Sequence, residues 1–213
     1  VHGHWAMYLR DPARSVFRLY APLVAVTSGL LGRNGWTRRW LTRALQRRGI
    51  TGYFSLYEIP PTLLRQFDLC QRSDIFAPGA FPGLETPFDA ARRLGLRWRV
   101  WSWQHPEEAN RRGLEKALRA GEEEFLFFYS PQLDSVMHAH GTRSPQTRRS
   151  LADFADFTAR MLSLARERYD EVRLLVFGDH GMADVTAVSD LLGPIERLGL
   201  KMPREMLAFV DST

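Results

Sequence analysis

The feature that most constrains the fold is one apolar run that ends in an acid and an imidazole. Residues 172–177 read VRLLVF, and such branched and aromatic residues are typical of a strand buried on both faces of a sheet. The run stops at Gly178, and Asp179 and His180 follow directly. In open α/β sheets ligands bind beyond the carboxyl ends of the strands, so the position favours a site. A simple turn, with the Asp capping a loop and a glycine at positive φ, explains the same residues equally well.

Patterns typical of helices and strands alternate along much of the chain. Alternation of this kind indicates a mostly parallel sheet with helices on both faces. We therefore predict an α/β fold of three layers, α/β/α, around a mostly parallel central sheet. The expected helices cover residues 36–48, 87–95, 106–120, 145–169 and 187–198, and the expected strands cover 97–103, 125–129, 172–177 and 206–210.

The longest expected helix has a clear start and one apolar face. Ser144 suits the N-cap, and Pro145 suits the first helical position. Helical spacing then places a row of larger, mostly apolar side chains on one face, which we expect to pack against the sheet. This row consists of Leu151, Phe154, Thr158, Met161, Leu162, Ala165 and Tyr169.

The part of the chain before residue 84 gives fewer signals. Residues 36–48 fit an amphipathic helix stopped by Gly49. We favour a helix that packs on a core and exposes its arginines over one that lies on an anionic surface. Residues 51–83 are aromatic, rich in proline and aperiodic, which indicates a long loop of the kind that often caps a site. We expect a single domain over residues 1–213.

The composition is that of an ordinary globular protein. Of the 213 residues 45% are hydrophobic and 25% charged, and no apolar run approaches the roughly 18 residues that cross a membrane. The first residues carry no recognisable secretory signal. Cys70 is the single cysteine, which excludes a disulfide framework or a cysteine-based metal cluster within the chain, and we expect it to be a buried apolar residue. These features favour a cytoplasmic location without deciding it.

The net charge of +5 comes almost entirely from arginine, because Lys116 and Lys201 are the only lysines. Guanidinium groups bind phosphate through paired hydrogen bonds, so the balance suits an anionic partner. Arginines spread over helices are more often solvated faces, and we expect no direct binding of nucleic acid.

Two expected strands are each followed by an acid and a histidine. Asp134 and His138 come after the strand at 125–129, and Asp179 and His180 come after the strand at 172–177. Successive parallel strands are often neighbours, so both pairs can meet in one crevice at the edge of the sheet. Turn preferences alone rarely produce this arrangement twice.

Carboxylate oxygens and imidazole nitrogens are ligands for Zn²⁺, and they also suit Mn²⁺ or Fe. Two such pairs indicate two ions, which can clamp the attacking and leaving oxygens in a displacement at phosphorus. His140 lies close by, but its spacing gives it no defined role, and we expect it on the surface or behind the ligands.

These residues also carry a family resemblance. The segment from Asp134 to Gly141 resembles the Asp-x-x-x-His-x-x-Gly motif of the alkaline phosphatase superfamily, in its nucleotide pyrophosphatase/phosphodiesterase branch. FGDHGM, at 177–182, resembles the Asp-His-Gly-Met motif of that branch. Shorter likenesses to bacterial type I phosphodiesterases are GHW near the start, TGYFSLYEIP at 51–60 and AFVDST at the end. Met137 is a departure, because the branch commonly has Gly before the His.

The resemblance implies an alkaline phosphatase-like fold and a site with two divalent metal ions, Zn²⁺ first and Mn²⁺ as the alternative. Asp134 and His138 would hold one ion, and Asp179 and His180 the other. The family's Thr or Ser nucleophile and a further Asp would precede Val1, and a last His would follow Thr213. The resemblance therefore implies that this chain is the middle of a catalytic domain, incomplete at both ends. Thr27 and Ser28 form the only early hydroxyl pair in a plausible turn, and we do not nominate either.

The implied function is metal-dependent hydrolysis of a phosphodiester or phosphoanhydride bond in a small phosphate ester, through a covalent intermediate on the nucleophile. A sulfatase is disfavoured, because the residues after Cys70 do not match the modification sequence of that group. The alternative from another class is a non-catalytic metal-binding or scaffolding module of the same fold. Because the nucleophile is expected elsewhere, we predict that residues 1–213 alone do not turn over substrate.

Overall fold

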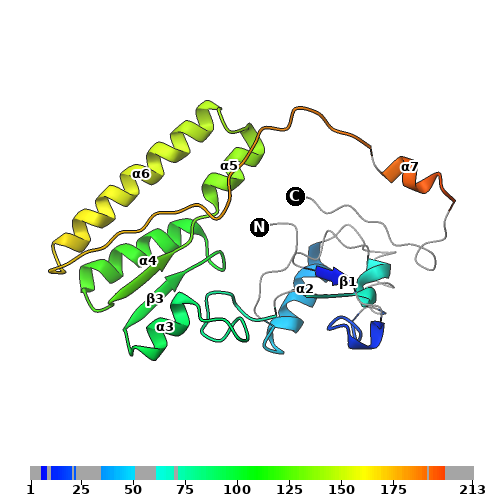
Figure 1. The fold of residues 1–213 in the computed structure, drawn as a ribbon, viewed down its shortest axis with the longest axis horizontal. Helices are drawn as coiled ribbons and strands as arrows, with labels where there is room; N and C mark the ends of the chain where they lie inside the picture. The colour runs from blue at the N-terminus through cyan, green and yellow to red at the C-terminus, as the bar shows by residue number, and fades with distance from the viewer. Residues whose placement is uncertain are drawn as a thin grey trace. The chain divides into compact units, whose positions relative to one another are not determined.

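The computed structural model describes residues 6–8, 11–20, 22, 35–50, 61–69, 72–190 and 192–199. The chain divides into two compact units, Val1–Gly83 with Ser189–Thr213, and Leu84–Val188. We call them the first and the second unit, and Figure 1 draws their helices and strands. Within the described residues no helix is both long and apolar enough to cross a membrane. The expected strand at 206–210, Cys70, Thr27 and Ser28 lie outside the described residues.

The first unit holds a small antiparallel sheet and a helix. Its described elements are β1 (Ala6–Tyr8), η1 (Pro12–Arg14), α2 (Gly35–Gln46), η2 (Pro61–Gln66), β2 (Phe67–Leu69) and α7 (Leu192–Glu196). Strands β1 and β2 pair with Ala6 opposite Leu69. The buried core of this unit consists of Phe17, Leu41, Leu45, Ile50, Leu64, Phe67 and Leu69.

Helix α2 confirms the expected amphipathic helix. Leu41 and Leu45 are buried, Trp40 is 47% exposed, and Gly49 follows the helix with φ of 79°. The helix therefore packs on a core, as we favoured. The prediction of one long loop over 51–83 is wrong in its described part, because η2 and β2 lie there and Phe67 is fully buried. A three-residue strand is too short to produce a readable alternation of apolar and polar residues.

The second unit is built on two parallel strands, β3 (Trp98–Trp101) and β4 (Phe125–Phe128). Trp98 lies opposite Phe125, and Trp101 lies opposite Phe128. Parallel strands linked by a helix form a βαβ unit, so the predicted α/β class is confirmed. The three-layer architecture and the alkaline phosphatase-like fold stay predictions.

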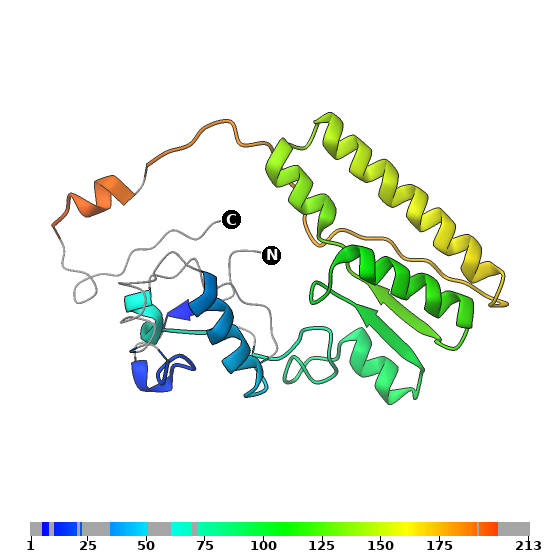
Figure 2. The same ribbon diagram turned by 180° about the vertical axis from the view of Figure 1, so that it is seen from behind.

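The second unit also holds four helices, and Figure 2 shows them from behind. Helix α3 starts with a capping box between Thr86 and Asp89, α4 ends at Gly121 with φ of 69°, and α6 starts at its N-cap Ser144. These ends agree with the expected helices. The helices are α3 (Pro87–Arg93), α4 (Glu107–Ala120), α5 (Gln132–His140) and α6 (Pro145–Arg166).

Helices pack on both faces of the two strands. On one face the Phe88 ring of α3 lies 6.1 Å from Phe125 and 5.2 Å from Phe127. On the other face Phe128 lies 5.4 Å from Phe157 of α6. Side chains of β4 therefore alternate between the two faces, as in a strand buried on both sides.

The inner face of α6 differs from the predicted row. Phe157, Met161 and Ala165 are buried, whereas Leu151 is 54% exposed. Phe157 was not in the predicted row, although it lies four residues before Met161. The row mixes positions from two adjacent stripes of the helix, and only contact with α4 and β4 decides which stripe is buried.

The prediction of a buried strand at 172–177 is wrong. Residues 171–178 join no strand ladder, and Leu175 and Phe177 are 85% and 73% exposed. An apolar run favours burial, but a strand also needs a partner for its backbone N–H and C=O groups. The segment after α6 instead runs back along the helices as an extended chain, drawn in orange in Figure 1. Likewise 187–190 is not helical, and α7 is confined to Leu192–Glu196.

Candidate metal centre

Helix α5 carries the first Asp–His pair. Asp134 and His138 are four residues apart, so the helix places them on one face, with Oδ1 of Asp134 3.5 Å from Nε2 of His138. Sequence reasoning placed this pair after a strand but did not predict the helix. The signals were Pro131 before its first residue and Gly141, with φ of 82°, directly after its last.

The second pair follows the extended segment. Nε2 of His180 lies 3.8 Å from Oδ1 of Asp179 and 3.9 Å from Oδ1 of Asp134. Nδ1 of His180 is 3.0 Å from the carbonyl oxygen of Gly181. When Nδ1 carries the proton and donates it to this carbonyl, Nε2 is left with a lone pair that faces the two carboxylates.

The structure thus brings the two pairs together, although the second pair does not follow a paired strand. Asp134 is central, because its Oδ1 faces an imidazole from each pair. Its side chain is 19% exposed, compared with 39% for His180 and 48% for His138. The cluster is open enough for a small molecule to reach the histidines.

The donor set fits a divalent metal. Two ligands bound to one Zn²⁺ at about 2.0–2.2 Å in tetrahedral geometry lie about 3.4 Å apart, close to the 3.5 Å between the donor atoms of Asp134 and His138 and the 3.8 Å between those of Asp179 and His180. Among the described residues, no group of three or more His, Cys, Asp or Glu side chains forms a ready metal-binding group. The fit to a metal ion therefore rests on the chemistry of the donor atoms and on the distances between the carboxylate oxygen and the imidazole nitrogen of each pair.

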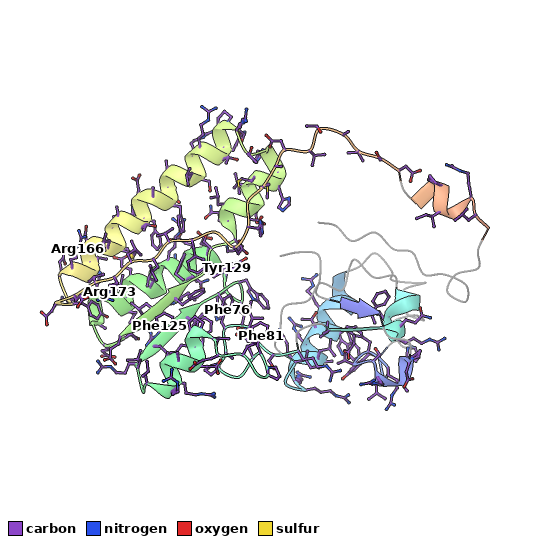
Figure 3. The ribbon with its side chains drawn as sticks, viewed as in Figure 1. Phe76, Phe81, Phe125, Tyr129, Arg166 and Arg173 are labelled. Carbon is purple, nitrogen blue, oxygen red and sulfur yellow. The ribbon has the colours of Figure 1, made fainter. Side chains whose placement is uncertain are left out.

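Tyr129 lies within the electrostatic field of both carboxylates and was not singled out in the sequence. It follows the last residue of β4 and lies at the end of the strand opposite to Phe125 (Figure 3). Burial, followed by the negative charges of Asp179 and Asp134, raises the pKa of the Tyr129 phenol. The signal available in the sequence was its place as the last residue of the predicted strand, because ligands bind beyond the carboxyl ends of such strands.

A partly buried ion-pair network supports the start of α5. Nη2 of Arg111 lies 2.9 Å from Glu107 and donates to Gln132, the first residue of α5. The Ser130 hydroxyl donates to Glu107 over 2.6 Å, which ties the chain between β4 and α5 to α4. Arg111 also pairs with Asp153 of α6 at 2.7 Å.

The charge of Arg111 is favoured in this place. Burial lowers its pKa, but hydrogen bonds to Glu107 and Asp153 and the charges of these carboxylates outweigh that effect, so the pKa is raised. The guanidinium also lies over the Phe157 ring, 4.6 Å from its centre. Arg111 therefore joins α4, α5 and α6 around one cation.

A second contact holds the other end of α5. Asp184 accepts two hydrogen bonds from Thr142, from the backbone N–H at 2.6 Å and from the hydroxyl at 3.0 Å. The first of these bonds, followed by the second, lowers the pKa of Asp184. Neither residue was predicted to matter. His140, two residues after His138, is exposed as expected.

The second unit is an α/β unit in which the two Asp–His pairs meet, and in open α/β sheets ligands bind beyond the carboxyl ends of the parallel strands. A sequence model of the family described as type I phosphodiesterase / nucleotide pyrophosphatase matches residues 36–199, which is more than half of the chain. The chain belongs to this family, and the resemblance in its motifs is confirmed. Comparisons with curated proteins and with solved structures gave no match.

Proposed function

We propose that this chain contributes part of a dimetal active site that hydrolyses phosphodiester or phosphoanhydride bonds. Membership of the type I phosphodiesterase / nucleotide pyrophosphatase family supports hydrolysis of phosphodiester bonds. The observation that carries the metal part is the meeting of the two pairs, with Asp134 Oδ1 3.5 Å from His138 and 3.9 Å from His180.

Each pair would hold one ion. Asp134 and His138 would bind the first, and Asp179 and His180 the second, each through a carboxylate oxygen and an imidazole Nε2. Zn²⁺ suits this donor set best, and Mn²⁺ is compatible with it. When bound, the ions supply Lewis acidity that neutralises charge on the phosphoryl oxygens.

The other groups of the site have supporting roles. The carbonyl of Gly181 orients His180 by accepting from Nδ1, and the Tyr129 hydroxyl lies near the carboxylates, where it can donate to an anionic oxygen. No described hydroxyl is nominated as the attacking nucleophile, which the family resemblance assigns to a Thr or Ser before Val1. The substrate would be a small phosphate ester, either a phosphodiester or a nucleotide pyrophosphate.

The test is a substrate panel with the full-length protein. We expect Zn²⁺ or Mn²⁺ to support turnover of a nitrophenyl phosphodiester and of a nucleotide pyrophosphate more strongly than of a phosphomonoester. Chelation and Asp179→Ala should each abolish it. Turnover that resists complete removal of metal would contradict the proposal. Tight binding of two Zn²⁺ ions without turnover of any ester would instead favour a non-catalytic metal-binding module.

The same panel tests the role of the 213-residue chain. Since we place the nucleophile outside it, we expect this polypeptide by itself to leave all three ester classes intact. Calorimetry should also give weaker Zn²⁺ binding than that of the full-length protein, because an incomplete ligand set loses affinity steeply. Robust turnover by the isolated polypeptide, lost in Asp179→Ala, would place the nucleophile within residues 1–213.

A further inference from the structure

We propose that Asp184 is a positioning residue that sets the distance between the two Asp–His pairs by binding the chain directly after α5. The inference rests on the proposed function for its effect on metal binding. The contact itself is independent of any metal. It joins the segment that carries Asp179 and His180 to the helix that carries Asp134 and His138.

The contact is a two-point attachment. Oδ1 of Asp184 accepts from the backbone N–H of Thr142 over 2.6 Å, and Oδ2 accepts from the Thr142 hydroxyl over 3.0 Å. Two hydrogen bonds to one carboxylate fix both distance and orientation, and bonds to a charged acceptor are stronger than neutral ones. Asp184 is four residues after His180, and Thr142 is four residues after His138. The attachment therefore lies four residues beyond the histidine of each pair.

The anchoring residue is itself held in place. Gly141 ends α5, and its carbonyl accepts a 2.7 Å hydrogen bond from the Thr147 hydroxyl in the first turn of α6. The backbone N–H of Thr147 in turn donates to the N-cap hydroxyl of Ser144. Thr142 thus lies in a fixed turn between two helices, whereas residues 181–188 form no helix or strand.

The glycine of the first motif also acquires a physical reason. A Cβ atom at Gly141 would lie 3.1 Å from Oδ1 of Asp184, and the residue has φ of 82°, which L side chains rarely adopt. Gly141 therefore permits both the turn and the close approach of the Asp184 carboxylate. On the other side of the second pair, the ring of Phe177 lies 6.4 Å from that of Phe127 in β4, so His180 lies between two contacts, and Asp184 supplies the hydrogen-bonded one.

The attachment is tested first without metal. In the metal-free full-length protein we expect Asp184→Ala to speed amide hydrogen exchange at Thr142 by tenfold or more, because the Thr142 N–H loses its acceptor. Exchange in α4 should stay unchanged and serves as the internal reference. Unchanged exchange at Thr142 would overturn the proposal, whether or not the protein binds metal.

The effect on the site is tested by Zn²⁺ competition with a chromophoric chelator and by steady-state kinetics. We expect Asp184→Ala to weaken Zn²⁺ binding about 10- to 100-fold and to lower kcat more than it raises KM, while the melting temperature of the metal-free protein stays nearly constant. Thr142→Val, which keeps the backbone donor, should cause a smaller loss of the same kind. Asp156→Ala, which removes an exposed carboxylate on α6, is the matched control and should change neither.

The conservative variant separates positioning from charge. In Asp184→Asn the amide oxygen can still accept from the Thr142 N–H, and the amide NH₂ can donate to the Thr142 hydroxyl oxygen. We therefore expect the Zn²⁺ affinity and kcat of this variant to stay within about threefold of the wild-type values. A loss as large as in Asp184→Ala would mean that Asp184 acts as a ligand or through its charge, and would overturn the proposal. If wild type binds no metal but exchange responds to Asp184→Ala, the proposed function fails and the attachment stands.

Discussion

Nε2 of His180 lies 3.9 Å from Oδ1 of Asp134, although one residue follows an extended segment and the other belongs to helix α5. The same carboxylate oxygen is 3.5 Å from Nε2 of His138. Asp134 therefore connects the two motifs of the candidate metal centre.

The two histidines at the end of α5 provide a matched comparison. His138 faces Asp134, whereas His140 is exposed, so only His138→Ala should remove a ligand. In the full-length protein we expect His138→Ala to lower the metal content by about one ion and activity at least 10-fold, and His140→Ala to leave both near wild type. Elemental analysis and steady-state kinetics measure these quantities. Equal effects from both substitutions would argue against His138 as a ligand.

Adjacent arginines on α4 should differ strongly in their effect on stability. Arg111 and Glu107 are each 13% exposed, so Arg111→Met leaves the largely buried Glu107 carboxylate without its cation and should cost about 3 kcal/mol of unfolding free energy. Arg112 and Glu108 are 69% and 72% exposed, so Arg112→Met should cost less than about 0.5 kcal/mol. Urea unfolding of both variants measures the difference. Similar losses would show that the Arg111 network contributes little.

Gly113 should resist replacement even though it lies inside a helix. Helix propensity alone predicts that Gly113→Ala stabilises the protein by up to about 1 kcal/mol. A Cβ atom there would overlap Nε1 of Trp101, which is buried against α4, so we expect a loss of about 1–3 kcal/mol instead. The sign of the change in unfolding free energy decides between the two. Trp101→Leu combined with Gly113→Ala should recover part of the loss, because the indole is then absent.

The ionisation of Tyr129 should report on metal binding. Burial and the charges of Asp179 and Asp134 raise its pKa above the ordinary value, so in metal-free protein it should ionise later than a free tyrosine. Bound divalent ions neutralise these carboxylates, so added Zn²⁺ should lower the pKa. NMR of ¹³C-labelled tyrosine, with the signal assigned from Tyr129→Phe, follows both titrations. A pKa that does not respond to Zn²⁺ would place the ions elsewhere.

The same shift predicts the direction of a stability change with pH. Because the folded-state pKa of Tyr129 is raised above the unfolded value, its contribution to stability is complete below the unfolded pKa and is lost as pH rises through the folded pKa. Tyr129→Phe removes the ionisable group. The variant should therefore gain stability relative to wild type above about pH 10 and show no such trend near neutrality.

Local sequence signals predicted three of the four helices of the second unit, α3, α4 and α6, and missed α5. Ser144 caps α6 as expected, Thr86 caps α3, and Gly121 ends α4 in the left-handed conformation. These outcomes depend on hydrogen bonds between residues three or four apart, so the information lies within the segment itself. The family could be inferred for a similar reason, because each of its two motifs, at 134–141 and at 177–182, is an unbroken run of residues.

Burial was less predictable than helix ends. The run at 172–177 is apolar except for Arg173, yet Leu175 is 85% exposed and the segment joins no strand among the described residues. Strand formation depends on a partner that is distant in the sequence, and the pattern of a single segment does not encode that partner. The inner stripe of α6 was misassigned for the same reason, because Phe157 is buried through its contacts with Phe128 and Arg111.

The sequence by itself determined the residue types of the candidate site, two Asp–His pairs in the motifs of one hydrolase family. Only the tertiary structure decided that Asp134 faces the histidines of both pairs, that Tyr129 lies in the field of the carboxylates, and that Asp184 reaches Thr142. The physical reason is the separation along the sequence of the residues that determine each feature. Caps, turns and motifs are written in neighbouring residues, whereas distances between side chains from separate elements are set by how those elements pack.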